Sequence, residues 1–338
     1  MINNSFFSTE IFRWFRENGR DLPWRETRDP YAIWLSEIIL QQTRIVQGWE
    51  YWERFMQTYP KVEDLAAASE DDVLKLWQGL GYYSRARNLH AAAKQIVALG
   101  SFPNTLDGIK SLKGVGDYTA AAIGSFAFDI PAAVVDGNVY RVLSRYFGID
   151  TPINSTQGKK EFAALAQSLL PASDAASYNQ GLMDFGAIQC TPQSPKCLLC
   201  PLAETCEALR TGRVEELPVK NKTLKVKTRH LSYIYIRCKG EVAIHRRGEG
   251  DIWQGLWEPY NASDAPQLPA FVHNPLLLAK DVKHVLTHRI LLADFYLQET
   301  ETRPLLPDDY IWVKEDEVEQ YGVPRLIEIM LEMVQVKS

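Results

Sequence analysis

The sequence has no long apolar run and no recognisable export signal. None of its apolar stretches approaches the roughly 18 to 20 residues that a membrane-spanning helix needs. The opening residues, MINNSFFSTE, lack the basic stretch followed by a hydrophobic block that marks a secretory signal peptide. We therefore expect a protein that neither enters a membrane nor is secreted.

Cysteine is scarce and unevenly placed. Four of the five cysteines lie within residues 190–206, and Cys238 stands alone in a segment rich in aromatic and β-branched residues. A crowded group of this kind suits a metal or cluster site in a reducing compartment better than a disulfide framework. We expect a protein of the bacterial-type cytoplasm, with Cys238 as an ordinary buried residue of a strand.

The chain also lacks the basic excess that nucleic-acid-binding proteins usually have. Its net charge of −5 argues weakly against such a partner. Residues 1–227 hold 25 basic and 25 acidic residues, and residues 228–338 hold 12 and 17, so the deficit lies in the C-terminal part. Residues 210–229 contain seven basic and two acidic residues, and they form either a basic face or a solvated linker.

Length and patterning predict two domains. The 338 residues, 46% of them apolar, can form more than one core. From residue 5 to about 206, helical spacing of apolar residues predicts an all-α domain of about ten helices. Beyond this, alternation of β-branched and aromatic residues predicts a smaller α+β domain with a last helix over 324–334. We expect a helical region over 1–210, a basic linker over 211–228, a second domain over 229–338, and strands over 231–239, 241–246, 284–288, 291–298 and 310–314.

The four clustered cysteines have the spacing C-x6-C-x2-C-x5-C. Cys190, Cys197, Cys200 and Cys206 thus fall within 17 residues, with no histidine among them. Structural zinc usually takes two C-x2-C pairs separated by a longer hairpin. This sequence has only one such pair, so its loop has to wrap tightly around a single bound group. That arrangement favours an iron–sulfur cubane. Zinc and plain reduced thiols remain alternatives.

A glycine-rich turn joins two predicted helices at residues 112–123, LKGVGDYTAAAI. Gly114 and Gly116 allow a tight turn and close approach of the backbone to a ligand. The following alanine-rich helix offers free N–H groups and a positive dipole end. The segment Gly114-Val115-Gly116 is therefore either an anchor for one DNA phosphate or a simple turn.

Two carboxylates stand in contrasting surroundings. Glu37 lies in the apolar helical stretch IWLSEIIL (33–40), where desolvation favours its protonated form. Asp136 follows a short apolar run and precedes a predicted helix. Cleavage of a glycosidic bond uses such a pair, because one carboxyl group protonates the leaving group and the other stabilises the sugar cation. The structural alternatives are, for Glu37, a buried acid paired with Arg44 or another base and, for Asp136, a helix N-cap.

Five ordered segments resemble the MutY adenine DNA glycosylases of the helix-hairpin-helix superfamily. They are residues 22–45, 76–93, 112–123 and 134–145 and the four cysteines, so the resemblance covers nearly the whole chain. It implies a helical glycosylase domain in which the cysteines hold a [4Fe-4S] cluster. The implied substrate is double-stranded DNA with adenine opposite 8-oxoguanine or guanine, and the implied reaction is hydrolysis of the adenine N-glycosidic bond in base excision repair by a monomer.

The resemblance also assigns roles by position. It implies that Glu37 protonates adenine, and that Asp136 stabilises or captures the sugar cation with support from Tyr118 and Asn138. A turn residue at Asn138 and a core aromatic at Tyr118 are the structural alternatives. The implied adenine pocket consists of Arg20, Trp24, Arg25, Leu40 and Gln180, and the implied probes of the 8-oxoguanine site are Gln42, Thr43, Leu80 and Tyr82. For Tyr82 a buried core aromatic is the alternative.

The second domain resembles the Nudix-like domain that follows the catalytic region in this family. It lacks the REx2E run with which a Nudix hydrolase binds magnesium, so recognition of 8-oxoguanine is its implied task. Leu286, Thr287 and His288 stand where the family's sensing loop often reads Phe-Ser-His. The hydroxyl and imidazole are kept and the aromatic ring is lost. A polar pair on an edge strand is the structural alternative.

Tyr118 distinguishes this chain from the endonuclease III branch. That branch carries a lysine nucleophile two positions after the second hairpin glycine, where this chain has Tyr118. Without the amine, a Schiff-base route lacks its nucleophile, so we expect a monofunctional glycosylase. The rival hypotheses are a pyrimidine-lesion glycosylase with lyase activity and a catalytically silent iron–sulfur DNA-binding protein.

Overall fold

The structure is a computed structural model that describes residues 4–221, 226–263 and 271–337. The chain forms two compact units, one of residues 1–63 and 91–222 and the other of residues 64–90 and 223–338. The sequence pattern predicted a change of structure near 211–228, but it did not predict that residues 64–90 group with the C-terminal segment. Lys222 and Lys225 of the predicted basic linker lie outside the described residues.

The described residues up to 210 contain twelve α-helices, slightly more than predicted, because several are only four to seven residues long. None of the helices in the described part of the chain has the length and apolar character needed to cross a bilayer. The α-helices are α1 (Asn4–Asn18), α2 (Pro30–Ile39), α3 (Ile45–Thr58), α4 (Val62–Ala67), α5 (Glu70–Leu76), α6 (Ser84–Leu99), α7 (Leu106–Lys110), α8 (Asp117–Phe128), α9 (Gly137–Phe147), α10 (Thr156–Leu169), α11 (Ala175–Asp184) and α12 (Glu207–Arg210). Short 3-10 or π turns are η1 (Pro23–Arg25), η2 (Phe185–Gln189), η3 (Cys197–Leu199) and η4 (Ala203–Thr205).

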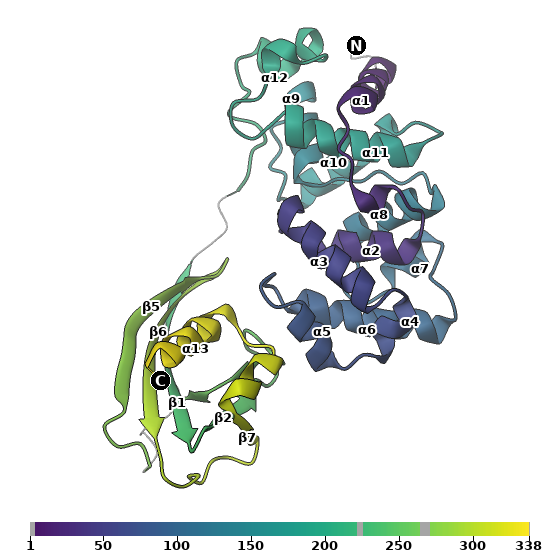
Figure 1. Ribbon diagram of the computed structural model, residues 1–338. Helices are drawn as coiled ribbons and strands as arrows, with labels where there is room; N and C mark the ends of the chain where they lie inside the picture. Colours follow the sequence, from purple (N-terminus) through teal and green to yellow (C-terminus); the bar gives the residue numbers. More distant parts are fainter. Residues whose placement is uncertain (1–3, 222–225, 264–270, 338) are drawn as a thin grey trace. The chain divides into compact units, whose positions relative to one another are not determined.

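Packing in the first unit brings α2 and α8 together, and α1 lies along α11 (Figure 1). Asp29 caps α2 by accepting a hydrogen bond from the Tyr31 amide, and the following turn places Pro30 at a position where its missing N–H costs nothing. Residues 31–39 of α2 are all buried, so this helix is a central element of the unit. Its one carboxyl side chain, Glu37, is therefore held among buried residues of the same helix.

A mixed sheet forms the second unit (Figure 1). Its strand order is β3-β2-β1-β6-β5, with β4 paired to β1 and β7 to β2; β1 and β6 are parallel and the other pairs antiparallel. Apolar residues of α13 pack with alternate residues of β1 and β6 in the larger core, and a smaller apolar cluster contains the other residues of β1. The elements are β1 (Lys227–Cys238), β2 (Glu241–Arg246), β3 (Trp257–Glu258), β4 (Tyr260–Asn261), β5 (Leu276–Val285), β6 (Arg289–Glu299), β7 (Tyr310–Lys314), η5 (Glu315–Gln320) and α13 (Arg325–Lys337).

Four of the five predicted strands and the last helix are present, but the strand predicted over 284–288 is mostly wrong. β5 ends at Val285, and residues 286–288 form the turn to β6. β5 was missed because its sequence, LLLAKDVKHV, lacks alternation and contains a bulge. Cys238 is 4% exposed at the end of β1, as predicted.

Candidate active site

Glu37 is a buried carboxyl group that no cation contacts in the part of the chain that the structure describes. It is 8% exposed on α2, and its Oε2 accepts a hydrogen bond from the Tyr118 hydroxyl at 2.9 Å. Burial raises the pKa of Glu37 to about 7, and the Asp136 carboxylate adds to the rise, whereas Tyr118 and the Arg25 charge oppose it. Among the described residues, the hydrogen-bond partner of Glu37 is Tyr118, so the structural alternative of a pair with Arg44 or another base gains no support.

Tyr118 comes from the first turn of α8, and it is half-buried. Burial, together with the neighbouring Glu37 and Asp136 carboxyl groups, raises the pKa of Tyr118 well above its usual value. The phenol is therefore neutral at physiological pH and donates its proton to the Glu37 hydrogen bond. Two residues 81 positions apart in sequence thus form one polar contact.

Asp136 is both a helix cap and a neighbour of Glu37. Its Oδ1 accepts from the Val139 amide at 2.7 Å, as the N-cap alternative predicted, and its Oδ2 accepts from the Asn138 side-chain amide at 2.8 Å. Burial raises the pKa of Asp136, and these hydrogen bonds with the Arg141 charge lower it. The cap fixes the carboxylate at the positive end of α9, so the structural and chemical roles do not compete.

Arg141 joins this group to the cysteine loop, a link that sequence reasoning missed. Its Nη2 donates to Asn138 Oδ1 at 2.8 Å and to the Gly186 carbonyl at 2.5 Å, and its Nε donates to the Cys190 carbonyl at 2.7 Å. The residue is 8% exposed. The only sequence signal was its position one helical turn after Asn138.

Two of the residues predicted for the adenine pocket, Arg20 and Arg25, are held by a buried carboxylate that was not predicted. Asp184, 0% exposed, accepts from the Arg20 backbone amide and guanidinium and from both terminal nitrogens of Arg25 at 2.8 Å. These contacts hold the pKa of Asp184 below its usual value against the effect of burial. Trp24 is buried and packs edge-on against two further tryptophans, Trp49 and Trp52.

Leu40 and Gln180 are the remaining two residues predicted for the adenine pocket. Leu40 is half-buried at the C-terminal end of α2, and Gln180 is half-buried on α11. The loop after α2 is tied to α8 by a hydrogen bond from the Gln41 amide to Thr119 at 3.3 Å. In the same loop Gln42 has φ 59°, in the left-handed region, and Thr43 is half-buried.

The predicted hairpin lies between α7 and α8. Gly114 has φ 79°, a conformation that glycine adopts without strain, and Gly116 is the extended N-cap of α8. A Cβ at Gly116 would meet no atom within 4 Å, so the space before the helix is open. Val115 is 8% exposed and anchors the turn in the core. The hairpin therefore presents open backbone at a helix N-terminus.

The four clustered cysteines are partly buried, and none of them is joined in a disulfide in the described structure. Burial is the main cause that raises the pKa of Cys200, and each of the other three thiols raises it further. The four sulfur atoms therefore interact electrostatically. The Arg145 guanidinium donates to Cys190 Sγ at 3.4 Å. Among the described residues, no group of three or more His, Cys, Asp or Glu side chains is placed to hold a single metal ion. Four thiols round one loop fit a cluster that gives each sulfur its own iron.

The basic segment 210–229 is less free than its composition suggests. Arg210 pairs with Glu207 at 2.6 Å, Arg213 with Glu216 at 3.1 Å, and Arg229 with Asp251. These arginines are therefore partly neutralised by acidic neighbours. The described part of the segment shows a mixture of charges in place of a continuous basic face.

A cleft of about 680 Å³ in the second unit contains most of the residues predicted to sense the lesion. Leu80 and Tyr82 line one part of it, and Leu286, Thr287 and His288, in the turn between β5 and β6, line another. Tyr82 is 46% exposed, so the core-aromatic alternative is wrong, and its hydroxyl is hydrogen-bonded to that of Thr287. The edge-strand alternative is also wrong, because Thr287 and His288 lie in a turn.

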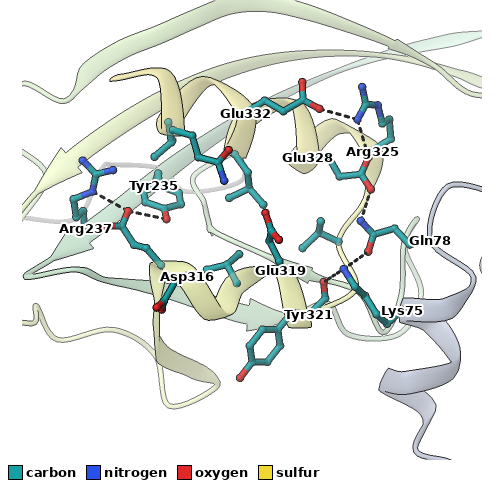
Figure 2. A pocket seen from close by; sticks show the side chains of 16 residues that line it. Lys75, Gln78, Tyr235, Arg237, Asp316, Glu319, Tyr321, Arg325, Glu328 and Glu332 are labelled. Atoms are coloured by element: carbon teal, nitrogen blue, oxygen red, sulfur yellow. Dashed lines mark hydrogen bonds and ion pairs between the residues drawn. The ribbon is translucent and has the colours of Figure 1, made fainter. Parts of the chain in front are cut away.

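A second cleft, of about 770 Å³, is lined by carboxylates of η5 and α13 (Figure 2). Three of these groups are paired. Arg325 contacts Glu328 at 2.9 Å and Glu332 at 3.0 Å, and Arg237 donates to Glu315 at 2.8 Å. Sequence reasoning did not predict these ion pairs.

Known proteins match each part of the chain. The sequence matches the HhH-GPD superfamily of base excision DNA repair proteins over residues 35–171, the iron–sulfur binding domain of endonuclease III over 190–206, and the NUDIX domain over 232–333. It is 30% identical to the adenine DNA glycosylase of Buchnera aphidicola (subsp. Acyrthosiphon pisum) over 96% of this chain and 97% of the relative. Identity to the mouse adenine DNA glycosylase is 42%, over 63% of this chain and 44% of the relative.

Solved structures agree with the helical part. A thermostable thymine-DNA glycosylase is 34% identical with a TM-score of 0.58, covering 62% of this chain and 97% of that one. A non-covalent endonuclease III–DNA complex, 22% identical with a TM-score of 0.55, shares the fold. The predictions of a helix-hairpin-helix fold, a Nudix-like second domain and an iron–sulfur cofactor are confirmed. The chain thus belongs to the MutY-type adenine DNA glycosylase family of base excision repair enzymes.

Proposed function

We propose that this glycosylase hydrolyses the N-glycosidic bond of adenine opposite 8-oxoguanine or guanine in duplex DNA and leaves the strand intact. The observation that carries the proposal is the contact of the buried Glu37 carboxyl group with the Tyr118 hydroxyl, beside Asp136. A carboxyl group whose pKa is about 7 holds its proton for an appreciable fraction of the time at physiological pH. A general acid works best under that condition.

Glu37 protonates the departing adenine, which is otherwise a poor leaving group. Asp136 then faces a sugar with oxocarbenium character, and its negative charge stabilises that cation. Asn138 and the α9 amide hold the Asp136 oxygens in place. The two carboxyl groups repel each other when both are charged, and their hydrogen bonding is unequal, so together they favour binding one proton. Glu37 can then act as the acid while Asp136 carries the negative charge.

The adenine itself is bound in a pocket that a flipped base enters. Arg20 and Arg25 supply donors whose positions are fixed by Asp184. Trp24, Leu40 and Gln180 add apolar contact and a side-chain amide. Gly114, Val115 and Gly116 bind one phosphate through backbone N–H groups at the start of α8.

The cysteines Cys190, Cys197, Cys200 and Cys206 hold a [4Fe-4S] cluster in this proposal, and the cluster orders the loop around it. Arg141 and Arg145 attach that loop to α9, the helix that Asp136 caps. Loss of the cluster is therefore expected to disturb Asp136 through Arg141.

The chain acts without a lyase step. At the position of the endonuclease III lysine it has Tyr118, whose pKa lies well above its usual value, so the phenol is neutral. Lys113 precedes the hairpin and is exposed. No amine occupies the place from which a Schiff base with the sugar would form.

Recognition of the opposite base falls to Gln42 and Thr43 after α2 and to the cleft of the second unit. There Leu80, Tyr82, Leu286, Thr287 and His288 supply a hydroxyl pair, an imidazole and apolar surface. Gln42 and Tyr82 both have positive φ, 59° and 47°, and such strain concentrates at ligand sites.

Single-turnover assays test the proposal. Duplexes carry adenine opposite 8-oxoguanine, adenine opposite guanine, thymine opposite guanine, or thymine glycol. We expect free adenine from the first two, with 8-oxoguanine preferred, and strand breaks only after treatment with hot alkali. Release of adenine from neither duplex overturns the main proposal, and breaks without alkali overturn the monofunctional part. Sedimentation with and without duplex tests our expectation of a monomer.

A further inference from the structure

The segment 131–135, which leads from α8 to Asp136, resembles a strand without partner strands. The described residues of its unit contain no strand that could pair with it. Its burial alternates, because Ala132 and Val134 are 6% and 1% exposed and the residues on either side of them are more exposed. This alternation is typical of extended backbone, in which successive side chains point to opposite faces. Asp136 also has extended φ and ψ, −96° and −176°, so its side chain continues the series of Ala132 and Val134.

Asn179 of α11 takes the place of a partner strand on the buried edge of this segment. Its Oδ1 accepts a hydrogen bond from the Val134 amide at 3.1 Å, and its Nδ2 donates to the Ala132 carbonyl at 2.9 Å. The same Nδ2 also donates to the Ser125 hydroxyl at 2.9 Å. Asn179 is 2% exposed, so its amide uses both donors and its acceptor away from water. Each of these groups would be costly to leave unpaired, and the amide therefore holds its partners firmly.

Gln167 of α10 makes the equivalent contacts on the exposed edge. Its Oε1 accepts from the Ala133 amide at 3.0 Å, and its Nε2 donates to the Pro131 carbonyl at 2.9 Å. Amide side chains from two helices thus bind successive residues of the segment on alternate edges, as neighbouring strands do in a sheet. These hydrogen bonds fix the segment along its own axis.

The helix that carries Asn179 also fixes the base-binding half of the site. Asp184 lies later in the same helix, α11. Its carboxylate holds Arg20 and Arg25. The segment before Asp136 and the arginines of the predicted adenine pocket are therefore attached to one helix.

We propose that Asn179 and Gln167 are positioning residues that set the place of the Asp136 carboxylate relative to Glu37 and to the sugar of the flipped nucleotide. The inference rests on the proposed function, because it concerns how the two carboxyl groups of that function are kept in place. The carboxyl groups repel each other when both are charged. A segment released from the two amides would therefore move Asp136 away from Glu37.

The test compares Asn179→Leu and Gln167→Met with the wild-type chain in single-turnover excision from the A·8-oxoguanine duplex at saturating enzyme. Both substitutions nearly keep the size of the side chain and remove its hydrogen bonds. Asn179→Leu should slow excision by up to about 100-fold, the loss expected when a reacting group is misplaced by about 1 Å. Gln167→Met should slow it less, because water can replace the lost partner on the exposed edge. Duplex affinity, measured by fluorescence anisotropy, should stay within a few-fold for both.

The pH profile of excision separates this role from a general loss of packing. Besides burial, the Asp136 carboxylate raises the pKa of Glu37. Tyr118 and Arg25 lower it. When Asp136 moves away, the pKa of Glu37 falls, and the alkaline limb of the profile should therefore shift to lower pH in Asn179→Leu and, to a smaller extent, in Gln167→Met.

Ser125→Ala is the matched control, because it removes one hydrogen bond of Asn179 at the same buried place and leaves both bonds to the segment 131–135. Its rate and its alkaline limb should equal those of the wild type. Wild-type rates in both amide variants overturn the inference, and so does an equal effect in Ser125→Ala or a slower rate with an unshifted limb. If Asn179→Leu does not fold, the rate and limb of Gln167→Met decide alone. If the wild-type chain itself releases no adenine, the proposed function fails, and this inference fails with it.

Discussion

Two buried glutamates, one in each unit, have opposite electrostatics. Glu37 in the helical unit is 8% exposed and Glu258 in the sheet unit is 1% exposed. Each accepts a hydrogen bond from a tyrosine hydroxyl, Tyr118 at 2.9 Å and Tyr233 at 2.8 Å. Yet the pKa of Glu37 is raised to about 7, and the pKa of Glu258 is below its usual value.

The difference lies in the cations. Burial raises the pKa of Glu258 as well, but hydrogen bonds from His245 at 3.2 Å and from Arg247 at 2.6 Å outweigh it. For Glu37, the cation that lowers its pKa among the described residues is Arg25, which makes no hydrogen bond to it. Burial with a contacting guanidinium therefore makes a structural anion, and burial without one makes a group that holds a proton near neutral pH.

The largest effect expected from this comparison is on excision. Glu37→Gln removes the proton donor and should slow single-turnover adenine release by about 100- to 10,000-fold, the usual contribution of a general acid. Duplex affinity, measured by fluorescence anisotropy, should stay within a few-fold, because the amide keeps the shape of the side chain. A variant that releases adenine at the parental rate would remove Glu37 from the acid role.

On the other side of the comparison, Glu258→Ala should destabilise the sheet unit. It leaves the Arg247 guanidinium, 9% exposed, without its buried partner, and breaking such a pair costs about 3 to 5 kcal/mol. Urea unfolding at pH 7 measures the change. Glu258→Gln, which keeps a hydrogen-bonding oxygen, is the milder control and should lose less. An unchanged midpoint for both variants would mean that the network contributes nothing to stability.

The same two residues differ in how stability depends on pH. In the folded protein the pKa of Glu37 is about 7, above the ordinary value of 4.5. The contribution of Glu37 to folding stability is therefore fully present below pH 4.5 and is lost as the pH rises through 7. One pKa unit corresponds to about 1.4 kcal/mol. When the pH is raised from 5 to 8, we therefore expect the free energy of unfolding of Glu37→Gln to increase by about 2 to 3 kcal/mol relative to that of the wild type. Urea unfolding at these two pH values measures the change. Equal differences at both values would contradict the raised pKa.

The local sequence predicted the surroundings of Glu37 better than those of Glu258. The burial of Glu37 follows from its apolar neighbours at 33–40, and the cap at Asp136 follows from the helix that begins after it. Local periodicity cannot show that Asp184 would bind Arg25 across 159 positions. The resemblance supplied roles for single residues, but it did not indicate the contacts of Arg141 or the network around Glu258.

The smallest effect tests the shared tyrosine contact. Because the Tyr118 hydrogen bond lowers the pKa of Glu37, Tyr118→Phe should raise that pKa and shift the alkaline limb of the excision pH profile upward by up to about one unit. The limb falls with rising pH in both proteins, since the acid must be protonated. Tyr233→Phe is the matched control, because it removes the equivalent hydrogen bond from Glu258, and it should leave the pH profile unchanged. If both variants shift the limb equally, the pH profile does not report the ionisation of Glu37, and the contrast between the two glutamates loses its link to catalysis.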